Sequence, residues 1–275
     1  MKFAVNWSPE AAELLEEDAI QFDLYKCPDW PDLVADAQSQ RPAYIHFPIV
    51  IGRGQAPEWD FARIENWLTT TDTRFVNAHI IPSQPHFLPG IAIEDLAEAL
   101  FGEVNALVQQ FGAERVIIEN CPYFSGGIAD GYIPEGMEPA LFQHLTSATD
   151  CGLLLDIAHS ILTCELLERD WKSYIQALPV ERIREMHITG TGVWSNGTRG
   201  DHLPLTDQNW AQFEWCLEQL RCGKWALPEV LAFEYGGIGK LQALCGSEKS
   251  VIASHIPRIQ HLAQSIRPVD QIEGC

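Results

Sequence analysis

The chain has 275 residues, of which 46% are hydrophobic and 10% aromatic, which is ample for one large core. Its formal charge of −20 disfavours binding to nucleic acid, because that affinity depends mainly on Lys and Arg contacts with phosphates. No apolar run approaches the ~20 residues that cross a bilayer, and the start of the chain leads into a strand pattern rather than a signal peptide. We therefore expect a cytoplasmic protein of one domain, residues 1–275, without a membrane or nucleic-acid partner.

Eight apolar segments alternate with helical patterns along the chain. The expected strands are residues 3–7, 22–25, 44–49, 75–81, 116–120, 153–156, 183–188 and 230–235. Expected helices include one that begins with Ser8 as N-cap and Pro9 at its first position, and a long one over residues 93–111. Residues 121–134 and 189–200 are rich in glycine or threonine and are expected to be loops.

Eight strands, each followed by a helix, is the count of a (β/α)8 TIM barrel. The alternative α/β architecture is an open, doubly wound sheet. That fold often carries a G-x-G-x-x-G fingerprint after its first strand, and none is found here. We therefore predict an α/β protein of the TIM-barrel class.

The most informative segment runs from Leu153 to His159. Three leucines lead directly into Asp156, and His159 follows three residues later. An unbroken apolar run of this kind is typical of a strand that is buried on both faces, as in a parallel sheet. Asp156 is then expected at the carboxyl end of the strand and His159 in the turn or helix that follows.

Acids and imidazoles recur at or near the ends of most of the expected strands. The candidates are His46, His79, Glu119, Asp156, His159, His187, Asp201, His202 and Glu234. Barrel strands converge at their carboxyl face, so these side chains are expected in one bowl. Such nitrogen and oxygen ligands would suit one to three divalent ions. The eight cysteines contain no C-x-x-C pair and are expected to be free and buried, which disfavours an iron–sulfur cluster.

Other polar residues are expected outside this site. His86, His144, His255 and His261 fall in predicted loops or helices and are expected to be structural. Glu185 is expected to point away from His187. Asp201 and His202 are adjacent, and an extended backbone would turn them to opposite faces.

Several of these segments together resemble the xylose-isomerase-like TIM barrels. They are most similar to the multinuclear non-haem iron-dependent oxidative enzymes within that superfamily. The segments are Glu119-Asn120, Leu154-Leu155-Asp156, residues 178–188, Asp201-His202-Leu203-Pro204 and Glu234. The resemblance extends from His46 to Glu234, which is most of the chain.

The resemblance implies a metal-dependent oxidoreductase that acts on a cysteine-containing peptide or small thiol. It implies two or three divalent ions, with iron favoured and zinc or manganese possible, and often a partner protein that presents the peptide. The ligands it implies are His46, His79, Glu119, Asp156, His187, His202 and Glu234. His159 and Asp201 remain candidates from their positions near strand ends.

Two other functions stay open. One is a redox-neutral isomerase, epimerase or hydrolase, in which a metal polarises a carbonyl or activates water and Glu119 or Glu234 is a catalytic base or bridge. A xylose-type isomerase is expected to place a lysine near the metal, and no lysine, Lys26 included, is expected at a ligand-bearing strand end. The other is a non-catalytic barrel in which aromatic residues such as Trp194 form a recognition surface.

Overall fold

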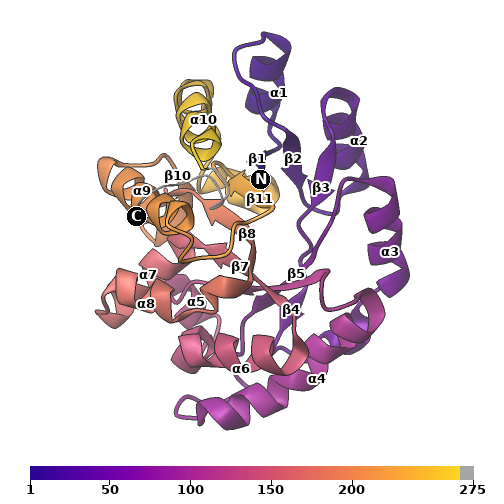
Figure 1. The fold of residues 1–275 in the computed structure, drawn as a ribbon, viewed down its shortest axis with the longest axis vertical. Helices are drawn as coiled ribbons and strands as arrows, with labels where there is room; N and C mark the ends of the chain where they lie inside the picture. The colour runs from indigo at the N-terminus through magenta and orange to yellow at the C-terminus, as the bar shows by residue number, and fades with distance from the viewer. Residues whose placement is uncertain (267–275) are drawn as a thin grey trace.

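The computed structural model describes residues 1–266 (Figure 1). Its centre is a nine-stranded sheet in the order β3-β2-β1-β11-β8-β7-β6-β5-β4, and neighbouring strands are parallel throughout. The strands of this sheet are β1 (Lys2–Asn6), β2 (Leu24–Cys27), β3 (Ala43–Ile45), β4 (Val50–Ile51), β5 (Val76–Ile80), β6 (Val116–Asn120), β7 (Gly152–Asp156), β8 (Ile183–Ile188) and β11 (Val230–Phe233). Strands β9 (Gly190–Val193) and β10 (Arg199–Leu203) form a separate antiparallel hairpin.

The helices surround the strands, which lie at the centre of the view in Figure 1. The α-helices are α1 (Pro9–Glu16), α2 (Pro31–Gln40), α3 (Phe61–Thr70), α4 (Ile93–Phe111), α5 (Ser125–Ala129), α6 (Pro139–Thr149), α7 (Ile157–Leu167), α8 (Trp171–Ala177), α9 (Asp207–Arg221) and α10 (Lys249–Gln264). Short 3-10 helices are η1 (Ala56–Glu58), η2 (Pro134–Met137), η3 (Val180–Arg182) and η4 (Gly239–Ala243). None of the helices within residues 1–266 has both the length and the apolar character that crossing a bilayer requires.

All eight predicted strands overlap strands of the curled sheet, and the predicted start of α1 is confirmed, since the Ser8 side chain accepts a hydrogen bond from the Ala11 amide. Three predictions were wrong in detail. Residues 121–134, expected as a loop, contain the short helix α5. Residues 44–49 do not form one strand: β3 ends at Ile45 and the chain re-enters the sheet as β4. The segment 189–200, expected as a loop, instead contributes to the β9–β10 hairpin.

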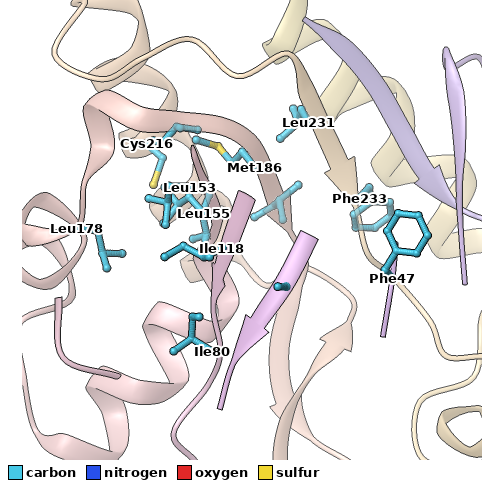
Figure 2. Packing of buried hydrophobic residues seen from close by; sticks show 14 of the residues in the cluster. Phe47, Ile80, Ile118, Leu153, Leu155, Leu178, Met186, Cys216, Leu231 and Phe233 are labelled. Atoms are coloured by element: carbon cyan, nitrogen blue, oxygen red, sulfur yellow. The ribbon is translucent and has the colours of Figure 1, made fainter. Parts of the chain in front are cut away.

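The three leucines of β7 show how the sheet is buried on both faces. Leu153 and Leu155 belong to the large core between the sheet and the helices, where they lie near Ile118 and Met186 (Figure 2). Leu154 points the other way and packs in a smaller cluster with Phe75 and Ile117. Full burial of each leucine side chain contributes about 1.5–3 kcal/mol to stability. Because the barrel is packed both inside and outside, this strand needs apolar side chains on both of its faces.

The barrel is closed between β3 and β5 largely by side chains. Within residues 1–266 no backbone ladder joins these two strands, and β4 pairs with β5 instead. Asn77 of β5 bridges the gap: its side-chain oxygen accepts from the Phe47 amide at 2.7 Å and its amide nitrogen donates to the Phe47 carbonyl at 3.1 Å. The Thr73 hydroxyl accepts from the Ile45 amide at 2.8 Å. We refer to this closure as the β3–β5 seam.

Six of the eight cysteines are free and buried, as predicted. They are Cys27, Cys121, Cys151, Cys164, Cys216 and Cys245. Cys222 is only partly buried, and Cys275 lies outside the described residues.

Candidate metal centre

The candidate residues converge because they share one face of the barrel strands. Side chains two residues apart on a strand point the same way, so Asp156 follows the inward-facing Leu154 and Glu119 follows the inward-facing Ile117. The strand register then places neighbours side by side. His79 pairs with Glu119 across β5 and β6, and Asp156 pairs with His187 across β7 and β8.

One half of the site is built around Glu119. The Nε2 atoms of His46 and His79 lie 3.0 Å apart, and they lie 3.4 and 3.2 Å from Oε2 of Glu119. Nδ1 of His79 is 2.9 Å from the Ile49 carbonyl. Because a carbonyl can only accept, the His79 proton is on Nδ1, and Nε2 presents its lone pair to the site.

His159 of α7 extends this half of the site. Its Nδ1 lies 2.9 Å from the Asn120 carbonyl and 3.3 Å from Oε1 of Glu119. Its Nε2 lies 3.0 Å from Oδ2 of Asp201 and 3.7 Å from Oδ2 of Asp156. The first contact assigns a donated proton to Nδ1, so Nε2 is the atom that faces the two aspartates.

Asp156 is held in place by its backbone and by one of its own oxygens. Its Oδ1 caps α7 by accepting from the His159 amide at 2.8 Å. The Asn120 side chain accepts from the Asp156 amide and donates to the Asp156 carbonyl, both at 2.9 Å, and donates to the Ser160 hydroxyl at 3.0 Å. The remaining oxygen, Oδ2, is therefore fixed in direction and free to bind a ligand.

The other half of the site contains His187 and Glu234, and here the prediction for Glu185 was wrong. Oε1 of Glu185 lies 2.7 Å from Nε2 of His187, because residues two apart on β8 share a face. Glu185 also accepts from the Tyr44 hydroxyl at 2.8 Å. With Nε2 donating to Glu185, the His187 Nδ1 faces Oε1 of Glu234 at 3.2 Å and Oδ2 of Asp156 at 3.8 Å. A carboxylate that orients a ligand histidine in this way is common behind metal sites.

The prediction that no lysine lies at a ligand-bearing strand end was also wrong, because Lys26 contacts Glu234. Lys26 is the penultimate residue of β2, its side chain is 8% exposed, and its Nζ forms an ion pair with Oε1 of Glu234. Lys26 follows the inward-facing Leu24, so the alternation along β2 was a usable signal. Residues 22–25 carried a weak strand pattern, and Lys26 fell just outside it.

Asp201 and His202 both border the site, although an extended backbone would separate them. His202 has a φ of 60°, in the left-handed region, where the pairing of β10 with β9 shifts register. Its Nδ1 lies 3.3 Å from the Gly236 carbonyl. His202, His46 and Lys26 are among the residues that line a cavity of about 140 Å³. Through this cavity a small ligand or a side chain can reach the site.

Trp194, which is partly buried, supports the backbone of Asp201. Its Nε1 donates to the Asp201 carbonyl at 2.8 Å, and its ring packs edge-on against Phe124 with centroids 6.0 Å apart. A Cβ at Gly200 would lie 2.2 Å from the Trp194 ring. His255 is structural as expected, since its Nε2 accepts from the Leu205 amide at 3.1 Å.

The Glu119 half of the site favours an ionised carboxylate. Burial opposes the ionisation of Glu119, but His79, His159 and His46 outweigh it and hold its pKa well below the usual range. Burial, reinforced by the charge of Lys26, lowers the pKa of His46 well below its ordinary value. His46 is therefore neutral near pH 7, which is the form that binds metals.

Protons compensate charge elsewhere in the site. Burial raises the pKa of Asp156 to about 7, although His159 opposes the shift. Burial disfavours a charged His187, but the Glu234 and Glu185 carboxylates outweigh it and raise the pKa of His187 to about 10. Both groups would have to lose a proton before they could bind a cation.

The unbonded atoms of the site fit a metal ion. His46 Nδ1, Glu119 Oε2, Asp156 Oδ2 and His187 Nδ1 are buried and make no hydrogen bond. Three sets of side chains have ligand atoms within 4.8 Å of one another: His46, His79 and Glu119; Glu119, Asp156 and His187; and His46, Glu185 and His187. Buried polar groups left without partners are costly unless something binds them.

Thiols lie near these sets but are not in the form that binds metals. Burial raises the pKa of Cys121 well above its ordinary value, and it raises the pKa of Cys27 to about 12. Thiolate, not thiol, is the metal ligand. The donor set is therefore imidazole and carboxylate, as expected from the sequence.

Three comparisons with known proteins concern the family and the fold of the chain. Residues 55–222, more than half of the chain, match the model of a family described as RiPP precursor modification enzyme MbnB/TglH/ChrH. A UPF0276 protein from Caulobacter sp. (strain K31) is 32% identical over 82 residues. That match covers 28% of this chain and 29% of the relative's length.

Solved structures share the fold over nearly the whole chain. A 3-keto-D-glucoside 4-epimerase from E. coli superposes with a TM-score of 0.57 and 12% identity, covering 96% of this chain and 99% of that one. A sugar phosphate isomerase/epimerase from Parabacteroides distasonis gives 0.55 and 10%, covering 94% and 98%. These likenesses confirm the predicted α/β barrel.

Proposed function

Because the chain belongs to the RiPP precursor modification enzyme family MbnB/TglH/ChrH, we propose that it is an iron-dependent oxidative enzyme that modifies a cysteine-containing peptide. The membership supports an enzyme of peptide modification. The finer proposal specifies iron, dioxygen as the oxidant and cysteine as the modified residue. A partner protein that presents the peptide belongs to the same proposal.

One observation supports the proposal most directly. Around Glu119, two imidazole nitrogens and a carboxylate oxygen lie within 3.4 Å of one another, and the Glu119 Oε2 among them makes no hydrogen bond. Electron-rich atoms repel one another at such distances unless protons or a cation lie between them. Mixed imidazole and carboxylate ligands suit iron, manganese or zinc.

The protein's own groups would prepare the site. Residues proposed to hold metal are His46, His79, Glu119, Asp156, His159, His187, Asp201 and His202. Glu234, which is paired with Lys26, is a ninth candidate. Iron would supply the redox chemistry that these side chains lack. Glu119 lies in two of the three ligand sets and could bridge two ions. The cavity lined by His46 and His202 would admit the substrate cysteine.

The experiment is to purify the protein without chelator, measure its metals, and supply a cysteine-containing peptide under air. We expect bound iron, together with oxygen consumption that requires the peptide. A matched peptide with serine in place of cysteine should consume no oxygen. If the protein holds only zinc or manganese and oxygen is not consumed, the oxidative proposal is wrong.

A second candidate is a redox-neutral isomerase or epimerase of the same superfamily. The observation that favours it is Lys26, which lies inside the site and contacts Glu234. A lysine close to the metal is expected of a xylose-type isomerase. Turnover of a hydroxycarbonyl compound without oxygen, by protein loaded with manganese alone, would select this candidate.

A further inference from the structure

The ion pair between Lys26 and Glu234 is enclosed by the barrel. Both side chains are at most 8% exposed. Oε1 of Glu234 also lies 3.2 Å from Nδ1 of His187, so one carboxylate oxygen faces an ammonium and an imidazole. The positive charge of Lys26 also opposes protonation of His46 and His187. The ammonium therefore occupies a position from which it influences most of this half of the site.

The buried charges of the site do not balance without added cations. Five carboxylates are buried there, each with one negative charge: Glu119, Asp156, Glu185, Asp201 and Glu234. Within residues 1–266, Lys26 is the only lysine or arginine among the buried residues. With the imidazoles neutral, four negative charges remain, which two divalent ions would neutralise. A third ion would leave an excess of positive charge in a buried site, which is costly.

We infer that the ammonium of Lys26 serves as a permanent cation of the site. It keeps Glu234 in an ion pair and thereby limits the site to two metal ions. This rests on the proposed function only in taking the site to be a metal centre. Glu234 would become a metal ligand only if the Lys26 ammonium withdrew from it. Two ions would then be held by the ligand sets that share Glu119, where the described residues provide no ammonium.

The test measures metal stoichiometry and affinity, not turnover. Wild-type protein stripped of metal is titrated with Mn²⁺ alone in a calorimeter and should bind two ions. Lys26→Met removes the ammonium but keeps a long side chain. It should bind a third ion or bind its second ion at least about tenfold more tightly, within the range that neighbouring groups exert on metal affinity.

Two further variants show whether the gain in metal binding of Lys26→Met comes from Glu234. Lys26→Arg keeps the cation and should behave as wild type. In the double variant Lys26→Met/Glu234→Gln the gain should disappear, because the released carboxylate is absent. Circular dichroism of each metal-free variant checks folding. Lys26→Gln replaces Lys26→Met if the latter does not fold.

The outcomes separate this inference from the proposed function. A wild-type protein that binds no Mn²⁺ and no Fe²⁺ refutes the metal centre itself. A wild-type protein that binds two ions, with Lys26→Met indistinguishable from it, refutes the role of Lys26 alone. Unchanged metal binding with a weaker KM for substrate in Lys26→Met would place Lys26 in the substrate site instead and would also overturn the inference.

Discussion

Glu119 and Glu234 are both buried glutamates at the ends of barrel strands, and β7 and β8 lie between their strands in the sheet. Glu119 faces the imidazoles of His46, His79 and His159 within 3.4 Å. Glu234 faces one imidazole and the ammonium of Lys26. The same residue type is thus neutralised in two ways. The first half of the site needs protons or ions from solution, whereas the second contains its own positive charge.

The largest effect is expected when the first half loses its charge. Glu119→Gln should weaken Mn²⁺ binding about a hundredfold, because Glu119 takes part in two ligand sets. Glu234→Gln should weaken it less than about tenfold. Calorimetric titration of both proteins measures the difference. Equal losses would show that the two glutamates have the same role.

The next effect concerns the residues between the two glutamates. Asp156→Ala and His187→Ala should each lower bound metal about tenfold or more, with little loss of barrel structure, since each offers one unbonded ligand atom. Elemental analysis and circular dichroism measure the two properties. His86→Ala is the control and should retain its metal. Normal metal content in Asp156→Ala would remove that residue from the ligand set.

A smaller effect is expected from pH. The pKa of Asp156 is raised to about 7 by burial, so the metal-free protein holds a proton there below pH 7 that a cation must displace. Release of the Asp156 proton should therefore raise Mn²⁺ affinity about fivefold between pH 6 and pH 7. His187, with its pKa raised to about 10, should add about tenfold per pH unit over this interval and continue the rise above pH 7. Titrations in buffers of different ionisation enthalpy count the protons. Affinity that is constant from pH 6 to pH 8 would contradict the protonated site.

The smallest effect is expected from the thiol beside Glu119. Cys121→Ala should leave metal content unchanged, because burial keeps the thiol protonated and the ligand sets contain imidazoles and carboxylates. Metal analysis of the purified variant checks this. A loss of metal together with retained folding would add Cys121 to the site.

The barrel and much of the site could be predicted because both depend on local patterns. The run from Leu153 to Asp156 identifies a buried strand with an acid at its end, and the same pattern at Glu119 and Glu234 locates the mouth of the barrel. Alternation along each strand decides which side chains face inward. That rule, applied consistently, also places Glu185 on the same face as His187.

What could not be predicted depends on contacts between distant segments. Alternation along β2 turns Lys26 inward, but it does not show that β11 lies next to β1 and so brings Glu234 close to Lys26. His202 reaches the site because the hairpin bends through a left-handed residue. Glycines and threonines in residues 189–200 resemble those of a loop, and only pairing with the following segment makes them a strand.

The β3–β5 seam gives the proposed metal a second effect. His46 follows β3 and His79 lies on β5, so their facing nitrogens stand on either side of the one gap that backbone ladders do not close within residues 1–266. An ion bound between them would cross-link β5 to the segment that follows β3, across the wall of the barrel. Loading and unloading it would then change how readily that wall opens. Slower deuterium uptake by the amides of residues 43–51 in metal-bound than in metal-free protein would show this cross-link directly.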